Sequence, residues 1–356
     1  HENYLLERST PFDRVVTQFT GFLVSRQVFT GAGRVGLGQA SQRPGFQISQ
    51  RADFFEAEVG LETTLNRPII NTRDEPHADA TLHRRLHVNL SEISTYLKVG
   101  TASWVLRAIE AGLVPPTVRV DQPVMTMRAV SHDPTCRQLL RLVDGRRMTA
   151  MDLQEVYLDA ARACYERHAG ELGESARIEA KDIFTRWQEV LDTLRRDPTE
   201  LADQLDWVAK LQLMESYRNR DGLGWASPKL ALIDLQYCDV DPQRSLFAAL
   251  VRKGRMRQLL TGDEIEQARL APPTDTRAYF RGRVMEKYGP AVVAASWDSV
   301  IFDVPGKPAL QRLPLLDPLK GTKAQVGPVI DASDDVVALF ENLEPTSRPR
   351  AQPHSE

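Results

Sequence analysis

Apolar residues recur every three to four positions from residue 91 onward, which is the spacing of an amphipathic helix. Long helices are predicted at 91–111, 150–168, 176–195 and 199–218. Thr149 and Asp152 form a capping-box sequence at the start of the second helix. Pro198 separates the last two helices because proline disrupts a helix interior. Residues 149–220 are therefore expected to form an antiparallel helical section.

The first ninety residues show mixed patterns. A helix is predicted from Pro11 to Val28, with Gly31 or Gly33 at its end. The glycines at 31, 33 and 36 match the dinucleotide-binding fingerprint in letters, but they follow a helical pattern instead of a strand. We therefore interpret them as a turn. Short β-type runs follow at 46–48, 54–59, 68–71 and 86–88.

Shorter elements occupy the last part of the chain. Helices are expected at 263–271 and 276–288, and a strand at 300–302. We place a domain boundary near residue 262. The resulting prediction is an α+β protein with a larger domain at 1–262, a small α+β domain at 263–343 and a disordered tail at 344–356.

The composition excludes several classes of protein. The chain has 356 residues, of which 42% are hydrophobic and 26% charged, so it can bury a sizeable core. Its net charge of -3 gives no argument for nucleic acid or membrane partners. The three cysteines are far apart and odd in number, which fits a reducing, cytoplasmic location.

The densest polar segment runs from Asn71 to His87 and includes three arginines and three histidines. One interpretation is a solvated, charged loop between two strands. The other is an anion and metal site, because arginine grips phosphate or carboxylate with two hydrogen bonds and imidazole can bind a cation. A zinc site formed by His77, His83 and His87 is a further alternative, although the glutamate of the HExxH motif is missing.

Two other groups of residues could take part in ligand binding. His1, Glu2 and Asn3 offer an imidazole, a carboxylate and an amide at adjacent positions. Strand alternation would place His1 and Asn3 on one face and Glu2 on the other, whereas the alternative is a frayed terminus. Arg277 and Arg281 are one helical turn apart and could reach a polyphosphate, or could form a surface basic pair.

The segment Pro68–Asp79, which reads PIINTRDEPHAD, resembles the Pup ligase and depupylase family. The fold of that family is similar to glutamine synthetase and the carboxylate-amine ligases. The resemblance is also carried by motifs at 1–5, 25–27, 49–51, 84–87, 98–101, 273–282 and 295–302. It extends to about residue 343 and implies a glutamine-synthetase-like antiparallel sheet backed by helices.

Within the family, the segment Phe54–Leu65 with its EVGLETT core resembles the Pup deamidase/depupylase branch. Ligases of the family carry a more polar, serine-rich segment there. The resemblance implies an amidohydrolase that deamidates the C-terminal glutamine of Pup and cleaves the Pup–lysine isopeptide bond. A Pup–protein ligase of the same fold, a non-catalytic Pup-binding module and a stand-alone zinc hydrolase are the alternatives.

The resemblance also implies roles for single residues, with ATP and Mg²⁺ as cofactors and with Pup and pupylated proteins as partners. The implied metal ligands are His1 and His87. The implied nucleotide contacts are Asn3, Arg85, Arg277 and Arg281. The implied contacts to the Pup C-terminus are Arg51, Arg73 and His77.

The chain departs from the family pattern before His1. Family members carry a strand of alternating glutamates and a catalytic aspartate in that region, and neither is present in this sequence. The catalytic aspartate is therefore expected upstream of His1. The resulting expectation is a fragment, or one chain of a split enzyme that pairs with a separate N-terminal chain and is inactive by itself.

Overall fold

The computed structural model describes residues 2–62, 65–88 and 92–343, and it describes only the backbone of His87, Val88 and Glu92. The chain divides into two compact units. The first comprises the residues up to Asp74 together with Arg84–Leu259. The second begins at Leu260 and includes the short excursion Glu75–His83, which the sequence-derived boundary near 262 assigns to the first domain.

A four-stranded sheet forms one layer of the first unit. Its order is β1 (Glu2–Glu7), β6 (His83–Val88), β5 (Pro68–Asn71) and β4 (Ala57–Gly60). Strands β5 and β6 are antiparallel, whereas β4 and β5 are parallel. The prediction of β-structure between residues 46 and 90 is confirmed for these strands.

The predicted strand at 54–59 is only partly correct. The 3₁₀ turn η1 (Ala52–Phe54) occupies its beginning, and β4 starts at Ala57. The turn is anchored by Asp53, whose buried carboxylate accepts hydrogen bonds from other parts of the first unit. This anchoring is a tertiary effect, so the local run of apolar residues does not reveal it.

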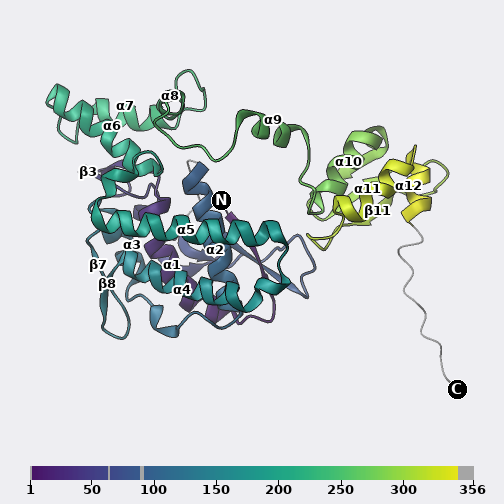
Figure 1. Cartoon of the computed structure of the whole chain (residues 1–356), viewed down its shortest axis with the longest axis horizontal. Helices are drawn as coiled ribbons and strands as arrows, with labels where there is room; N and C mark the ends of the chain where they lie inside the picture. The colour runs from purple at the N-terminus through teal and green to yellow at the C-terminus, as the bar shows by residue number, and fades with distance from the viewer. Residues whose placement is uncertain (1, 63–64, 89–91, 344–356) are drawn as a thin grey trace. The chain divides into compact units, whose positions relative to one another are not determined.

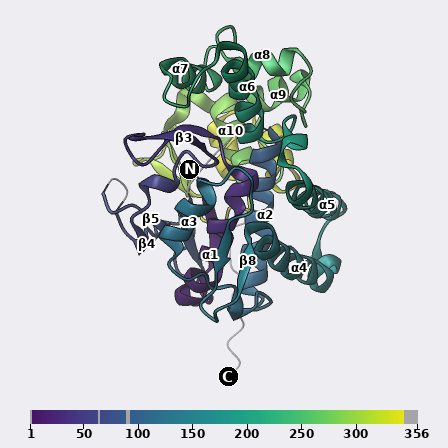
Figure 2. The same ribbon diagram turned by 90° about the vertical axis from the view of Figure 1, so that its left-hand side faces the viewer.

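Long helices form the second layer of the first unit, and most begin and end where the apolar pattern predicts. They are α1 (Phe12–Thr30), α2 (Glu92–Glu110), α4 (Ala150–His168) and α5 (Glu174–Arg196). Helices α1, α2 and α4 contact one another, and α5 packs on α2 and α4 (Figure 1, Figure 2). Thr149 and Asp152 form the expected capping box at the start of α4.

The predicted helix at 199–218 is wrong over residues 199–205. The 3₁₀ turn η4 (Pro198–Leu201) comes first, and α6 (Asp206–Asp221) begins only after an extended residue, Leu205. The side chain of Leu205 is fully buried. The extended backbone at Leu205 places its side chain in the core, although the local apolar periodicity predicts a continuous helix there.

Shorter elements complete the first unit, including two antiparallel hairpins. They are β2 (Arg34–Leu37), β3 (Arg43–Gln47), η2 (Pro116–Val118), α3 (Pro123–Ser131), β7 (Leu139–Arg141), β8 (Arg147–Thr149), η3 (Ala169–Glu171), α7 (Pro228–Tyr237) and α8 (Leu246–Arg252).

Helix α1 lies at the centre of the first unit, and its second half is buried on nearly all sides. The ring of Phe22 meets Tyr157 and Trp187 edge-on, with centroid distances of 5.5 and 6.1 Å. At Gly21 a Cβ atom would lie 2.6 Å from the carbonyl oxygen of Val118. Only glycine therefore allows this close approach to α1.

The second unit has its own core around an antiparallel sheet of order β11-β10-β9. Its elements are α9 (Gly262–Leu270), α10 (Ala278–Tyr288), η5 (Gly289–Ala291), β9 (Val292–Ala295), β10 (Ser299–Phe302), β11 (Gln311–Pro314), α11 (Lys323–Ala332) and α12 (Val336–Leu343). The helices predicted at 263–271 and 276–288 and the strand at 300–302 are confirmed. None of the helices within the described residues has the length and apolar character needed to cross a membrane.

A buried lysine joins three elements of the first unit. The ammonium group of Lys210 on α6 is fully buried and lies 2.6 Å from Oδ1 of Asp234 on α7. It also donates a hydrogen bond to the carbonyl oxygen of Gly33, at 3.0 Å. The second carboxylate oxygen of Asp234 accepts a hydrogen bond from the backbone N–H of Val35, at 2.8 Å. The pair therefore ties α6 and α7 to the hairpin that begins at Arg34.

We expect the substitution Lys210→Met to lower the free energy of unfolding by about 3–5 kcal/mol, because it leaves the carboxylate of Asp234 without its buried partner. The matched control is Lys229→Met, which removes an exposed ion pair to Asp221 and should cost about 0–1 kcal/mol. Denaturant unfolding of both variants measures the difference. Equal losses of unfolding free energy in the two variants would show that the buried Lys210 pair stabilises the fold no more than the exposed Lys229 pair.

Candidate functional site

The two faces of strand β1 have different environments. Glu2 and Leu6 are buried, with exposed fractions of 8% and 2%, whereas Asn3 and Leu5 are exposed. Strand alternation predicts this separation of Glu2 from Asn3. The sheet therefore has a covered side, toward the helices, and an open side.

The buried side of β1 carries an ionic cluster. The guanidinium group of Arg26 on α1 donates two hydrogen bonds to the carboxylate of Glu2, at 2.8 and 3.0 Å. The ammonium group of Lys98 on α2 lies 3.1 Å from the same carboxylate, and the Tyr4 hydroxyl donates a hydrogen bond to it. The side chains of Glu2 and Arg26 are only 6% and 5% exposed. This cluster holds the first strand against the two central helices.

The cluster changes the protonation of its members. Burial alone would raise the pKa of Glu2, but the charge and hydrogen bonds of Arg26 and the charge of Lys98 lower it to about 2. Burial, together with the neighbouring positive charges of Arg26 and Arg51, lowers the pKa of Lys98. Glu2 therefore stays ionised, and the surrounding positive charges repel one another.

Arg51 adds a further positive charge beside this cluster. It immediately precedes η1, and both burial and the charge of Arg67 lower its pKa. Its Nε atom is buried and has no hydrogen-bond partner among the described residues. A buried guanidinium N–H without an acceptor is costly, so this arrangement favours an incoming anion.

The open side of the sheet brings together two of the residues singled out in the sequence. The Nε atom of Arg85 on β6 donates a hydrogen bond to Oδ1 of Asn3 on β1, at 2.8 Å. The backbone N–H of Arg85 donates to Asp74, which also pairs with Arg8 at 2.6 Å. Residues that are 82 positions apart thus meet on adjacent strands.

The structure describes neither side chain of the two histidines proposed as metal ligands. His1 lies outside the described residues. The backbone of His87 pairs with Asn71 across β6 and β5, and its side chain is outside the described part of the chain. The expectation that His1 and His87 share one pocket with Asn3 and Arg85 therefore stays a prediction.

Arg73 and His77 occupy different units. Arg73 is exposed at the end of β5, and its backbone N–H donates a hydrogen bond to the Asn71 side chain, at 2.8 Å. His77 belongs to the excursion in the second unit and has a positive φ of 46°. Its carbonyl oxygen accepts a hydrogen bond from Nη1 of Arg277, at 2.6 Å.

Arg281 also makes backbone contacts within the second unit. Its Nη1 atom donates hydrogen bonds to the carbonyl oxygens of Ser296 and Trp297, at 3.2 and 3.4 Å. Its guanidinium group lies over the Trp297 ring, 5.3 Å from the centroid. These contacts orient Arg281 along the edge of a cavity that includes Trp297.

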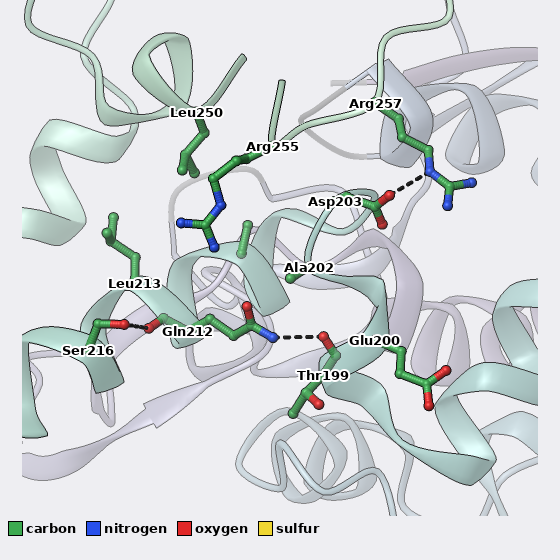
Figure 3. A pocket seen from close by; sticks show the side chains of 11 residues that line it. Thr199, Glu200, Ala202, Asp203, Gln212, Leu213, Ser216, Leu250, Arg255 and Arg257 are labelled. Atoms are coloured by element: carbon green, nitrogen blue, oxygen red, sulfur yellow. Dashed lines mark hydrogen bonds and ion pairs between the residues drawn. The ribbon is translucent and has the colours of Figure 1, made fainter. Parts of the chain in front are cut away.

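A cavity of about 340 Å³ lies between α6 and the segment that follows α8 (Figure 3). Within it, Arg257 pairs with Asp203 at 2.5 Å, and the Gln212 side chain donates to the carbonyl oxygen of Thr199 at 2.7 Å. The guanidinium group of Arg255 points toward Gln212 (Figure 3). Because most of these polar groups pair with one another, we take the sheet and its ionic cluster as the candidate site.

Sequence comparison identifies the protein family to which this chain belongs. The family profile described as "Pup-ligase protein" matches residues 1–301. The chain belongs to this family. It is 54% identical to a depupylase from Acidothermus cellulolyticus, over 96% of this chain and 69% of the relative. It is 50% identical to a Pup deamidase/depupylase from Mycolicibacterium smegmatis, over 96% of this chain and 68% of the relative.

Two solved structures of the Pup ligase PafA share the fold. The structure in complex with ADP has a TM-score of 0.80 and 34% identity, and the alignment covers 93% of this chain and 73% of that protein. The structure in complex with Pup has a TM-score of 0.79 and 32% identity, with coverage of 99% and 74%. The predicted α+β fold and the predicted membership of the Pup ligase and depupylase family are confirmed.

The side chains of this family member fit an anion better than a metal ion at the buried cluster. Arg26, Lys98 and Arg51 offer N–H donors, and the carboxylate of Glu2 is engaged by Arg26. Among the described residues, no group of three or more histidine, cysteine, aspartate and glutamate side chains is arranged to hold a metal ion. For a nucleotide, Arg85 supplies a guanidinium group suited to phosphate, beside the Asn3 amide.

Arg26 and Lys98 are the functional candidates that sequence reasoning missed. Both lie in motifs that carry the family resemblance, but no role was assigned to either residue. The available signal was Arg26 itself, which sits within the apolar run of α1 between Phe22 and Phe29. A charged residue on a buried helix face requires a partner, so its position predicts an ionic contact without identifying Glu2.

We expect Glu2→Gln to lower the free energy of unfolding near neutral pH by about 3 kcal/mol. This energy corresponds to the difference between the ordinary pKa of a glutamate, 4.5, and the pKa of Glu2 in the folded protein, about 2. Because the folded-state pKa is the lower one, this stabilisation is present above the ordinary pKa and is lost as pH falls toward 2. Denaturant unfolding across this pH range should show a flatter pH dependence for the variant. Glu7→Gln, an exposed change on the same strand, is the control. The same acid sensitivity in Glu2→Gln and the unmodified protein would contradict this assignment.

Proposed function

We propose that this family member is an ATP- and Mg²⁺-dependent amidohydrolase of the deamidase/depupylase type. It would deamidate the C-terminal glutamine of Pup and cleave the isopeptide bond between Pup and a lysine. The observation that carries the proposal is the cationic cluster, in which Arg51 keeps a buried N–H without a partner among the described residues. The greater identity to depupylases than to the solved Pup ligases supports the hydrolytic branch.

The cationic cluster would receive a carboxylate of the Pup tail. Arg26 and Lys98 act on the single carboxylate of Glu2, and Arg51 repels Lys98, so a second carboxylate would lower the electrostatic cost of the cluster. Arg51 would donate hydrogen bonds to it, and Lys98 would contribute charge. The family resemblance implies Arg73 and His77 as further contacts to the tail. These contacts hold and orient the tail so that the amide carbon is presented in a fixed position.

The nucleotide would bind on the open side of the sheet. Arg85 and Asn3 would contact it, and the family resemblance implies Arg277 and Arg281 as further nucleotide contacts. ADP in a solved Pup ligase supports nucleotide binding. Mg²⁺ bound by His1 and His87 would neutralise phosphate charge. The residues of this chain bind and orient these groups.

The assay that tests the proposal uses the complete enzyme with ATP and Mg²⁺. One substrate is Pup ending in glutamine, and the other is Pup joined to a lysine side chain. We expect the mass change of deamidation with the first and release of free Pup with the second. ATP-consuming attachment of Pup to a lysine acceptor would instead identify a ligase. Binding of Pup without any turnover would identify a binding module.

We expect Arg51→Ala to weaken Pup binding by roughly 2–5 kcal/mol, because it removes a partly buried donor from the proposed carboxylate site. Arg73→Ala should cost less, about 0–1 kcal/mol, because Arg73 is exposed. Calorimetric titration of Pup into the complete enzyme measures both changes, and binding should weaken at higher salt.

Arg147→Ala is the control for these titrations, because Arg147 is exposed on β8. It should leave the affinity for Pup unchanged. An unchanged affinity in Arg51→Ala would show that the cluster has a structural role only. Lost turnover with unchanged affinity in Arg73→Ala would place Arg73 at the nucleotide instead of the Pup tail.

A further inference from the structure

A cavity of about 520 Å³ lies beside η1 in the first unit. Its walls are the loop of the β2–β3 hairpin, Asp53 of η1, part of α3 and His132. Its volume falls in the range of about 300–1,000 Å³ that is usual for ligand sites. None of the residues assigned to the nucleotide or the Pup tail lines this cavity.

The negative charge at the base of the cavity is already paired. Asp53 is 4% exposed and accepts hydrogen bonds from the Gly38 backbone and the Gln47 side chain, both at 2.7 Å. Nε2 of His132 is 2.7 Å from Oδ1, the other oxygen of this carboxylate. Nη1 of Arg34 lies 3.9 Å from Oδ2. Burial would raise the pKa of Asp53, but these hydrogen bonds and His132 lower it. Asp53 therefore stays ionised and its charge is offset by its neighbours.

The positive charges on the cavity wall are less completely paired. Arg128 donates to the carbonyl oxygen of Phe55, and its Nε atom is buried with no hydrogen-bond partner among the described residues. Arg43 is exposed, and its side chain has no hydrogen bond or ion pair in the part of the chain that the structure describes. Glu56, which does not line the cavity, accepts a hydrogen bond from the side chain of Gln39, at 3.0 Å. Two arginines thus line a cavity whose own carboxylate is already satisfied.

We propose that this cavity binds the carboxylate side chain of an acidic peptide segment. A guanidinium group matches a carboxylate in shape and charge, and Arg128 carries an Nε donor that no described residue satisfies. Asp53 makes the cavity less favourable for a doubly charged phosphate, because a second negative charge would approach a carboxylate that stays ionised. Met125, which is 59% exposed on the wall, adds apolar contact for a peptide chain. This inference does not depend on the proposed deamidase activity.

The test is calorimetric titration with two blocked tetrapeptides, one with two central glutamates and the other with glutamines in their place. We expect the glutamate peptide to bind at least about tenfold more tightly, or about 1.4 kcal/mol, because hydrogen bonds to charged groups are stronger than those to neutral ones. Arg43→Glu should weaken its binding by about tenfold or more. Because Arg43 is exposed, we expect this variant to fold as the unmodified protein does, and its unfolding curve checks the fold.

Arg255→Glu is the matched control, because it makes the same charge change on an exposed arginine at the cavity of Figure 3. It should leave the affinity for the glutamate peptide unchanged. Equal binding of the two peptides, or equal losses in Arg43→Glu and Arg255→Glu, would overturn the proposal. Inorganic phosphate is titrated as a third ligand. Tighter binding of phosphate than of the glutamate peptide, lost in Arg43→Glu, would overturn the assignment to a carboxylate.

Discussion

The buried ion pair between Glu2 and Arg26, supported by Lys98, fixes the strand on which the candidate site is built. Shifting β1 by one residue would turn Glu2 outward and Asn3 inward. Arg26 would then lose its carboxylate while remaining buried, which is among the most costly changes a core can undergo. The contact therefore specifies which side chains of β1 face the open side of the sheet. The hydrogen bond between Arg85 and Asn3 depends on that choice.

The same cluster links stability to binding. Glu2 neutralises only part of the positive charge around it, because Lys98 and Arg51 also act on this site. A fully neutralised cluster would stabilise the sheet more but would have little use for an anionic ligand. The excess charge and the buried N–H of Arg51 are thus costs to the free protein that a bound carboxylate would offset. Local inconsistencies of this kind are expected at functional sites.

The sequence predicts well where structure depends on neighbouring residues. The helix beginning after Pro11 and the capping box at Thr149 follow from local periodicity and capping chemistry. The contact between Glu2 and Arg26 joins positions 24 apart, and no spacing rule identifies it. The delay of α6 depends on burial of Leu205, which is likewise a tertiary effect. Asn3 and Arg85 were assigned through family resemblance, since no periodicity connects two positions so far apart.

The most informative error concerns η1, where a strand was predicted. A continuous strand from residue 54 would begin on the apolar pair Phe54 and Phe55, and it would remove the turn that follows Arg51. Instead, Asp53 is held by hydrogen bonds from Gly38 and Gln47, which fix the turn. Gly38 can direct its N–H there because its φ of 89° is accessible to glycine. Gly38, which follows strand β2, therefore helps to set the backbone beside Arg51. One short turn thus connects the ionic cluster with the cavity lined by Arg43 and Arg128, because Arg51 precedes the turn and Asp53 lies within it.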